Sequence, residues 1–212
     1  MDAPDPVLWV LSAYFLVIAV PSAYRLVAAH PGSPLWQQVH RGDEVAEVLM
    51  ALGMLAMVSP VGGPIPRAGW EAVFAVAAVW LAARWLRLPR ARAGPGYGNG
   101  CVRSQCGHHA VGAAVMFYMF GGMAGDGHAG HDTQPWLVLA GHEGSLVLAP
   151  LAIAATTYFL VDIVLCGVRC VRGRSGTGSR RPPAPALFSG GMRETSRAAM
   201  NVAMAAMLLA MV

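Results

Sequence analysis

Methionine is the residue type whose spacing most clearly suggests chemistry in this chain. Of the 12 methionines among 212 residues, all except Met1 fall in three short stretches. The stretches contain Met50, Met54 and Met57; Met116, Met119 and Met123; and Met192, Met200, Met204, Met207 and Met211. Steps of three and four residues place such side chains on one face of a helix. A thioether is a soft, uncharged ligand that suits Cu(I) and suits Mg²⁺, Ca²⁺ or Zn²⁺ poorly, so the pattern predicts three helical faces that bind Cu(I).

The three stretches also share a register when counting starts from a polar residue upstream. Counting 10 and 14 residues from His40 leads to Met50 and Met54, from His109 to Met119 and Met123, and from Arg197 to Met207 and Met211. Counting 7 residues from the same three starting points leads to Glu47, Met116 and Met204. In three parallel helices that face inward, equal offsets lie at similar depths. We therefore expect one ring of Met50, Met119 and Met207 and a second ring of Met54, Met123 and Met211, about 6 Å further along. Weak ligands repeated along a pore are typical of ion conduction, because the ion has to leave each site.

Other metal-ligating side chains flank the methionines. These candidates are His40, Glu47 and His109 at the beginnings of the methionine stretches, and His128, His131 and His142 in or beside the polar segment after residue 124. Imidazole and carboxylate groups are typical capture ligands for metal ions. The sequence therefore predicts a metal path with histidines at both ends.

The composition indicates a membrane protein. Hydrophobic residues make up 56% of the chain and charged residues 12%, which excludes an ordinary soluble domain. The apolar residues form blocks long enough to cross a bilayer at about 1.5 Å per residue. We expect an all-α, multi-pass protein of the plasma membrane, in contact with the lipid bilayer. The formal charge of +4 does not indicate a nucleic-acid partner, because the arginines lie between the apolar blocks.

The apolar blocks predict a single transmembrane domain, a six-transmembrane-helix bundle. The spans cover about residues 7–29, 39–58, 68–88, 108–124, 142–168 and 194–212, and residues 171–191 form a flexible cytosolic linker. Arginines concentrate after spans one, three and five, and the positive-inside rule then places these segments in the cytosol and both termini outside. Spans two, four and six run parallel and carry the methionines, which predicts three helical hairpins with a pseudo-threefold repeat.

The four cysteines, Cys101, Cys106, Cys166 and Cys170, lie beside the arginine-rich segments. We expect them in the cytosol and in the reduced form. Thiolates are soft ligands for Cu(I), so cysteines at the cytosolic end would favour inward transfer of the metal.

Each of these features also has a structural explanation. Methionine is a flexible filler of helix interfaces, and small residues beside it favour close helix packing. Carboxylates in the first turns of span two, such as Asp43, favour the positive end of a helix. Arg197 is expected to form a structural ion pair with Asp43 or Glu47. A structural or accessory subunit whose methionines only pack is therefore an alternative to copper binding.

A second alternative is a b-type haem protein that transfers electrons. His40 and His109 lie at the beginnings of two parallel spans, and one histidine from each of two helices can hold a haem iron. One haem does not account for three methionine stretches. The sequence has no His-Glu-x-x-His and no Gly-x-Ser-x-Gly motif, so it does not indicate an enzyme.

Two resemblances follow from these residues. Over residues 40–57, 109–123 and 197–211 the chain resembles an uncharacterised actinobacterial membrane family, DUF5134. That resemblance implies an actinobacterial plasma membrane and supplies no activity.

The three Met-x-x-x-Met motifs, at residues 50–54, 119–123 and 207–211, are locally similar to the Ctr family of copper uptake transporters. Members of that family are homotrimers whose pore carries two stacked methionine triads. The likeness implies Cu(I) as the cargo of a channel or transporter, with a metal donor or acceptor protein as a partner. This chain departs from the family in its six predicted spans, its outside C-terminus and its lack of a methionine-rich exterior tail.

Overall fold

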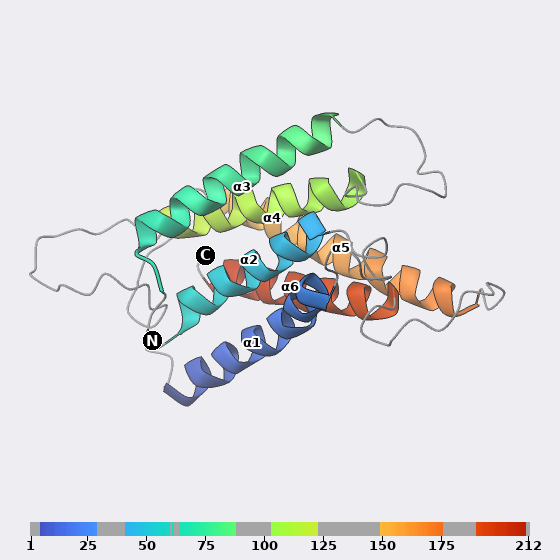
Figure 1. Ribbon diagram of the computed structural model, residues 1–212, viewed down its shortest axis with the longest axis horizontal. Coiled ribbons are helices and arrows are strands. Elements are labelled where there is room, and N and C mark those ends of the chain that lie inside the picture. The colour runs from blue at the N-terminus through green and yellow to red at the C-terminus, as the bar shows by residue number, and fades with distance from the viewer. Residues whose placement is uncertain are drawn as a thin grey trace, which may run out of the picture. The chain divides into compact units, whose positions relative to one another are not determined.

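The computed structural model describes residues 5–28, 41–59, 61, 64–87, 103–122, 149–175 and 190–210. These residues form six α-helices and no strand, which confirms the predicted all-α class (Figure 1). The helices are α1 (Asp5–Ala28), α2 (Arg41–Val58), α3 (Arg67–Arg87), α4 (Arg103–Gly122), α5 (Ala149–Ser175) and α6 (Gly190–Ala210). Because α5 continues to Ser175, the segment predicted as a linker from residue 171 begins with helix.

The chain divides into two compact units, Met1–Gly144 and Ser145–Val212, called unit 1 and unit 2 below. In unit 1, α1 packs on α2, α3 packs on α4, and α2 also packs on α4; in unit 2, α5 packs on α6. Each helix therefore packs on its neighbour along the chain, as expected for helical hairpins.

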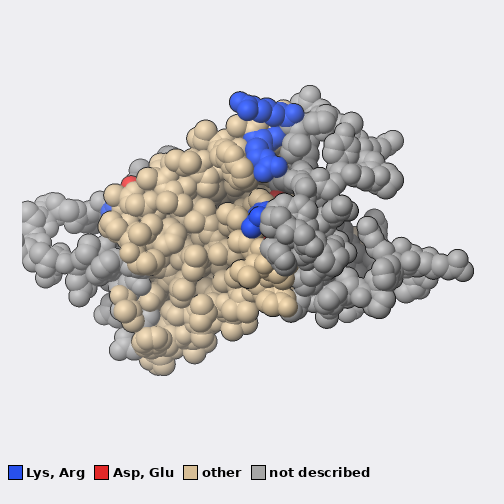
Figure 2. Space-filling model, in the orientation of Figure 1, with Lys and Arg blue, Asp and Glu red and all other residues tan. Residues whose placement is uncertain are grey.

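Three of the described helices are long and apolar enough to cross a membrane: Pro6–Ala28 of α1, Arg67–Arg87 of α3 and Ala149–Val168 of α5. These are the three helices without methionine. Helix α2 is more polar because Arg41, Asp43, Glu44 and Glu47 lie in its first turns. The structure is thus compatible with a membrane protein, and Figure 2 shows a broad described surface with few charged side chains.

Burial differs between the apolar and the methionine-bearing helices of unit 1. Helix α3 buries only Trp70, Phe74 and Leu81, whereas α2 buries more than half of its residues. Valines such as Val76 and Val79 of α3 are mostly exposed. An apolar helix with an exposed apolar face is the arrangement expected where lipid surrounds the protein.

An aromatic stack joins α3 to α4 inside unit 1. Trp70 stacks on Phe74 and on Phe120 with ring centroids 6.0 Å apart in both pairs, and Phe74 lies 5.6 Å from Phe120. All three side chains are buried. Offset stacking of this kind stabilises a helix interface and fixes the orientation of each ring.

Candidate functional site

Helices α2 and α4 are parallel, and two contacts fix their register. Asp43 Oδ1 lies 4.0 Å from His109 Nε2, and a Cβ atom built on Gly53 would lie 2.8 Å from Met116 Cε. The residues in contact are 66 and 63 positions apart (109 − 43 and 116 − 53), whereas the equal-offset prediction requires 69 (109 − 40). The contacts therefore depart from the predicted register by about 5–9 Å along the helix axis.

Methionines of both helices lie in the part of the interface that these contacts define. Met54 and Met119 are 65 positions apart, within the observed register, whereas Met54 with Met116 and Met57 with Met119 are 62 positions apart, just outside it. All four side chains are fully buried, and the contact with Gly53 shows that Met116 faces α2. Two Met-x-x-Met repeats thus lie on helices that pack against each other.

Gly53 permits this close approach, and alanine at this position should disturb it. The added Cβ would lie 2.5 Å from Cζ of Phe74 as well as 2.8 Å from Cε of Met116. The Phe74 ring stacks on Trp70 and Phe120, so any shift of the ring would disturb both contacts. We expect Gly53→Ala to lower the free energy of unfolding by about 1–3 kcal/mol, measured by denaturant titration in detergent micelles. Gly121→Ala is the control, because a Cβ there meets no atom within 4 Å; equal effects of the two changes would contradict the packing.

A cavity of about 100 Å³ lies between α2, α3 and α4. Met50 and His109 both line it, together with apolar side chains such as Phe74 and Leu81. His109 is buried, and its Nε2 lies beyond hydrogen-bond distance of Asp43 Oδ1. Pockets that hold drug-sized ligands have volumes of roughly 300–1,000 Å³, so this cavity matches a small ion better than a macrocycle.

Arg25 of α1 is the centre of a buried ion-pair network with α2. Its Nε donates to Oε1 and Oε2 of Glu44 at 2.9 and 2.8 Å, and its Nη2 donates to Oε2 of Glu47 at 3.3 Å. Ser22 accepts a hydrogen bond from Arg25 Nη2 at 2.8 Å and donates to Glu47 Oε2 at 2.6 Å. The Arg25 side chain is 0% exposed. Glu47, predicted as a metal ligand, is therefore engaged with Arg25 and Ser22.

A second buried polar cluster joins α5 to α6 within unit 2. Arg197 donates from Nε and Nη2 to Oδ2 and Oδ1 of Asp162, at 2.9 and 2.7 Å. Asn201 Nδ2 donates to Asp162 Oδ2 at 2.7 Å. Arg197 thus pairs with the neighbouring helix of its own hairpin, and the predicted pairing with Asp43 or Glu47 is wrong.

The described cysteines differ from each other. Cys166 is a free, buried thiol whose Sγ donates to Asp162 Oδ2 at 3.7 Å. Cys106 is disulfide-bonded, so the expectation of four reduced cysteines is wrong at this position. A disulfide is typical of an oxidising compartment, whereas the arginines near the start of α4 are typical of the cytosolic side. The orientation of the chain in the membrane stays a prediction.

The structure describes only part of the predicted site. Met204 and Met207 are buried in α6 of unit 2. The predicted ligands that lie outside the described residues are His40, Met123, His128, His131, His142 and Met211. Among the described residues, no three His, Cys, Asp or Glu side chains form a group that could hold a metal.

Sequence reasoning left Met57 out of the predicted rings, because an offset of 17 from His109 leads to Asp126. The Met-x-x-Met spacing that α2 shares with α4 was the signal for it. Arg25 was also missed as a member of a buried network. A charged residue inside an apolar span is costly unless it is paired, so its position alone indicated a nearby carboxylate.

The whole chain was compared with curated proteins, solved structures and protein-family models. No curated protein and no solved structure matches the chain. The model of the family described as Domain of unknown function (DUF5134) matches residues 39–211, which include α2 to α6. The chain therefore belongs to the DUF5134 family.

Proposed function

We propose that this protein is a Cu(I)-binding membrane protein whose metal site lies between α2 and α4 of unit 1. The proposed ligands are Met54 and Met57 of α2 and Met116 and Met119 of α4. The observation that carries the proposal is the full burial of these four thioethers on two packed parallel helices, with Met116 against Gly53 of α2.

The chemistry of the four side chains favours Cu(I) over harder cations. Thioethers are neutral and soft, which suits a monovalent soft ion. A divalent cation enclosed by neutral sulfur ligands would carry an uncompensated buried charge, which is costly. The surroundings of the sulfur atoms are apolar, with Phe74 against Gly53 beside Met116, so water competes poorly for the metal.

The approach to this site from the beginning of α2 is polar. Met50 and His109 line the small cavity there, and both are ligand types that Cu(I) accepts. Glu44 and Glu47 are paired there with Arg25, and Asp43 Oδ1 lies 4.0 Å from His109 Nε2.

The proposal extends from Cu(I) binding to transport of Cu(I) across the membrane. A multi-pass protein of the plasma membrane that passes Cu(I) along successive methionines would use Met123, and Met204, Met207 and Met211 of the last methionine stretch, in addition to the site in unit 1. A histidine route through His128, His131 and His142 would supply the metal from one side, and a metal donor or acceptor protein would exchange it.

Replacing Met54, Met57, Met116 and Met119 together by leucine should abolish tight Cu(I) binding. Leucine keeps the volume and the apolar character, and it removes only the ligand atom. We expect the Kd for Cu(I), measured by competition with a chromogenic Cu(I) chelator in detergent, to rise at least ~100-fold, because even changes outside the ligand set cost about 10–100-fold. Zn²⁺ binding should be negligible in both proteins.

The matched control is leucine at Met200, Met204 and Met207, which changes the same residue type in α6. Undiminished binding in this control supports the site in unit 1. Loss of binding in both variants would favour a site that also includes α6, and unchanged binding in both would leave the methionines as packing residues. A Soret band in the purified protein would favour haem b in place of copper.

A further inference from the structure

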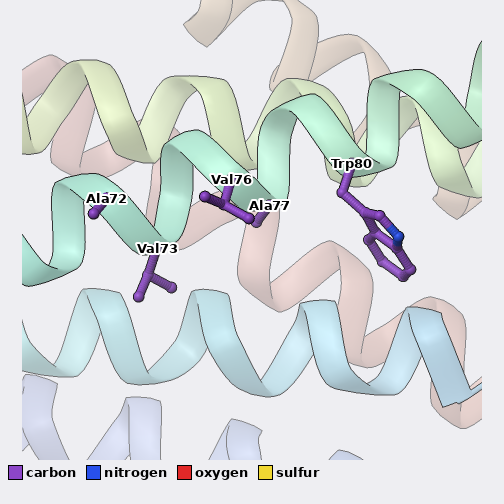
Figure 3. Close-up of a pocket in the computed structure, with 5 residues that line it drawn as sticks. All are labelled: Ala72, Val73, Val76, Ala77 and Trp80. Atoms are coloured by element: carbon purple, nitrogen blue, oxygen red, sulfur yellow. The ribbon is translucent and has the colours of Figure 1, made fainter.

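An apolar groove of about 400 Å³ lies on the surface of α3 in unit 1. All its lining side chains come from this one helix, and they are Ala72, Val73, Val76, Ala77 and Trp80 (Figure 3). Their spacing places them in one stripe along a helix face. Val76 is 69% exposed and Trp80 is 48% exposed, so the groove is open to the surroundings of the helix.

The same stripe continues into two arginines at the end of α3. Arg84 follows Trp80 by four residues and Arg87 follows it by seven, so both positions lie on the face of the groove. The guanidinium of Arg84 lies 5.0 Å from the centroid of the Trp80 ring, which lines the groove. Positive charge therefore adjoins the groove at its Trp80 end.

Neither of these two arginines pairs with a carboxylate in the described part of the chain. Arg25 and Arg67 form ion pairs with glutamates, whereas the printed neighbour of Arg84 is an indole ring. Residues 88–102, which follow α3, contain no Asp or Glu and add two arginines. Arg84 is half-buried and Arg87 is exposed. An anion can therefore reach both arginines.

We propose that this groove binds an anionic phospholipid of the surrounding bilayer, with an acyl chain along residues 72–80 and the phosphate beside Arg84 and Arg87. The planar guanidinium suits a phosphate group, because its fork of N–H donors can bind two oxygens at once. A tryptophan between apolar and charged side chains is typical of the membrane interface. Arginines at the end of an apolar helix attract anionic lipids in particular.

The length of the stripe agrees with the thickness of one leaflet. From Arg84 to Ala72 the helix rises about 18 Å, at about 1.5 Å per residue. One leaflet contributes about half of a hydrocarbon core that is about 30 Å thick. An acyl chain whose phosphate lies at Arg84 therefore extends along most of the groove. The proposal rests on α3 crossing the membrane, which its length and apolar composition permit, and it does not depend on copper binding.

A cavity between α1, α2 and the beginning of α3 provides a comparison within the same unit. Its volume is about 350 Å³, and apolar side chains such as Leu16, Leu52 and Ala56 form most of its wall. No charged side chain is among the described residues that line it. A lipid attracted by apolar surface alone should enter both sites, whereas a lipid held by its phosphate should prefer the groove on α3.

The test uses the purified full chain in detergent micelles, titrated with a phosphatidylglycerol that carries a photoreactive diazirine in one acyl chain. We expect saturable labelling within residues 72–80, located by mass spectrometry. Unlabelled phosphatidylglycerol should compete at concentrations about tenfold lower than phosphatidylcholine with the same acyl chains, because only the former carries a net negative charge.

Arg84→Gln should weaken binding about three- to tenfold, because it removes one positive charge beside the phosphate. The combined change of Arg84→Gln and Arg87→Gln should weaken it further. The matched control is Arg67→Gln at the beginning of the same helix, where Arg67 Nε lies 2.7 Å from Glu71 Oε1. This control should leave the Kd unchanged.

Two further variants test the groove without changing a charge. Ala72→Phe adds a ring at the apolar end of the groove. Val79→Phe adds a ring at a position of α3 that is 71% exposed and does not line the groove. We expect weaker labelling and a higher Kd only in Ala72→Phe.

Weaker binding in Arg84→Gln and Ala72→Phe, with unchanged binding in Arg67→Gln and Val79→Phe, supports the proposal. Equal affinities for phosphatidylglycerol and phosphatidylcholine, equal dissociation constants in Arg84→Gln and Arg67→Gln, or labelling confined to other segments would overturn it. Because the four-leucine variant of the copper site keeps α3 unchanged, lipid binding by that variant separates the two proposals.

Discussion

Replacing Arg25 with methionine should lower the free energy of unfolding by about 3–5 kcal/mol, because it leaves buried carboxylates without their counter-charge. Glu44 receives two hydrogen bonds from Arg25, and Glu47 receives one. Without the guanidinium, the two acidic side chains repel each other in a site that excludes water. Methionine keeps most of the aliphatic volume, so the loss reports on charge rather than on a cavity. The measurement is denaturant unfolding in detergent micelles, followed by circular dichroism.

The control for Arg25→Met is Arg67→Met, which breaks an ion pair that is partly exposed to solvent instead of buried. Arg67 Nε lies 2.7 Å from Glu71 Oε1, but the two side chains are 34% and 27% exposed. Such a pair contributes only about 0.3–0.5 kcal/mol. A combined change of Arg25→Met, Glu44→Leu and Glu47→Leu should regain most of the lost stability, since apolar replacement of a whole buried network is often neutral. If Arg25→Met and Arg67→Met are equally stable, the buried network does not exist as described.

The sequence predicted the helices well, because long apolar blocks and periodic methionines leave little choice of secondary structure. The burial of Met54, Met116 and Met119 also followed from their spacing along one helix face. The packing of α1 on α2, α3 on α4 and α5 on α6 agrees with the predicted hairpins, each a helix without methionine followed by one that carries it. These features depend on local pattern, which a single sequence contains.

The register between α2 and α4 could not be predicted, because it depends on how two surfaces fit. Counting from His40 and His109 assumes that both helices begin at the same depth. In the structure the absence of a side chain at Gly53 lets Phe74 and Met116 approach α2, and this contact sets the relative height of the helices.

The partner of Arg197 was missed for a related reason. The acidic residues of span two are prominent in the sequence, whereas Asp162 is a single carboxylate inside a very apolar helix. Asp162 nevertheless lies on the helix that precedes Arg197 in the same hairpin. Neighbouring elements along the chain pack together more often than distant ones, so proximity along the chain was the better indicator.

Asp162→Asn should destabilise the protein by about 3–5 kcal/mol, because Arg197 would keep its buried charge without a carboxylate. The two side chains are 10% and 11% exposed, so solvent screens the charge little. An amide has one acceptor oxygen in place of two, so it cannot satisfy both Arg197 and the Nδ2 donor of Asn201 in the same way. Unfolding in detergent micelles measures the effect, and Glu71→Gln in unit 1, where the carboxylate is partly exposed, should change stability by less than about 0.5 kcal/mol.

A double-mutant cycle then identifies the partner of Arg197 without relying on either single variant. Asp162→Asn and Arg197→Met remove opposite sides of one contact, so their combined effect should be smaller than the sum by about 1.5–3 kcal/mol. Glu47→Gln and Arg197→Met change residues of different networks, and their effects should add within about 0.5 kcal/mol. Coupling of Arg197 to Glu47 in place of Asp162 would contradict the α5–α6 cluster and favour a pairing of the last helix with span two. Because additivity is measured on the folded full chain, the result also shows whether the two buried networks stabilise units 1 and 2 independently.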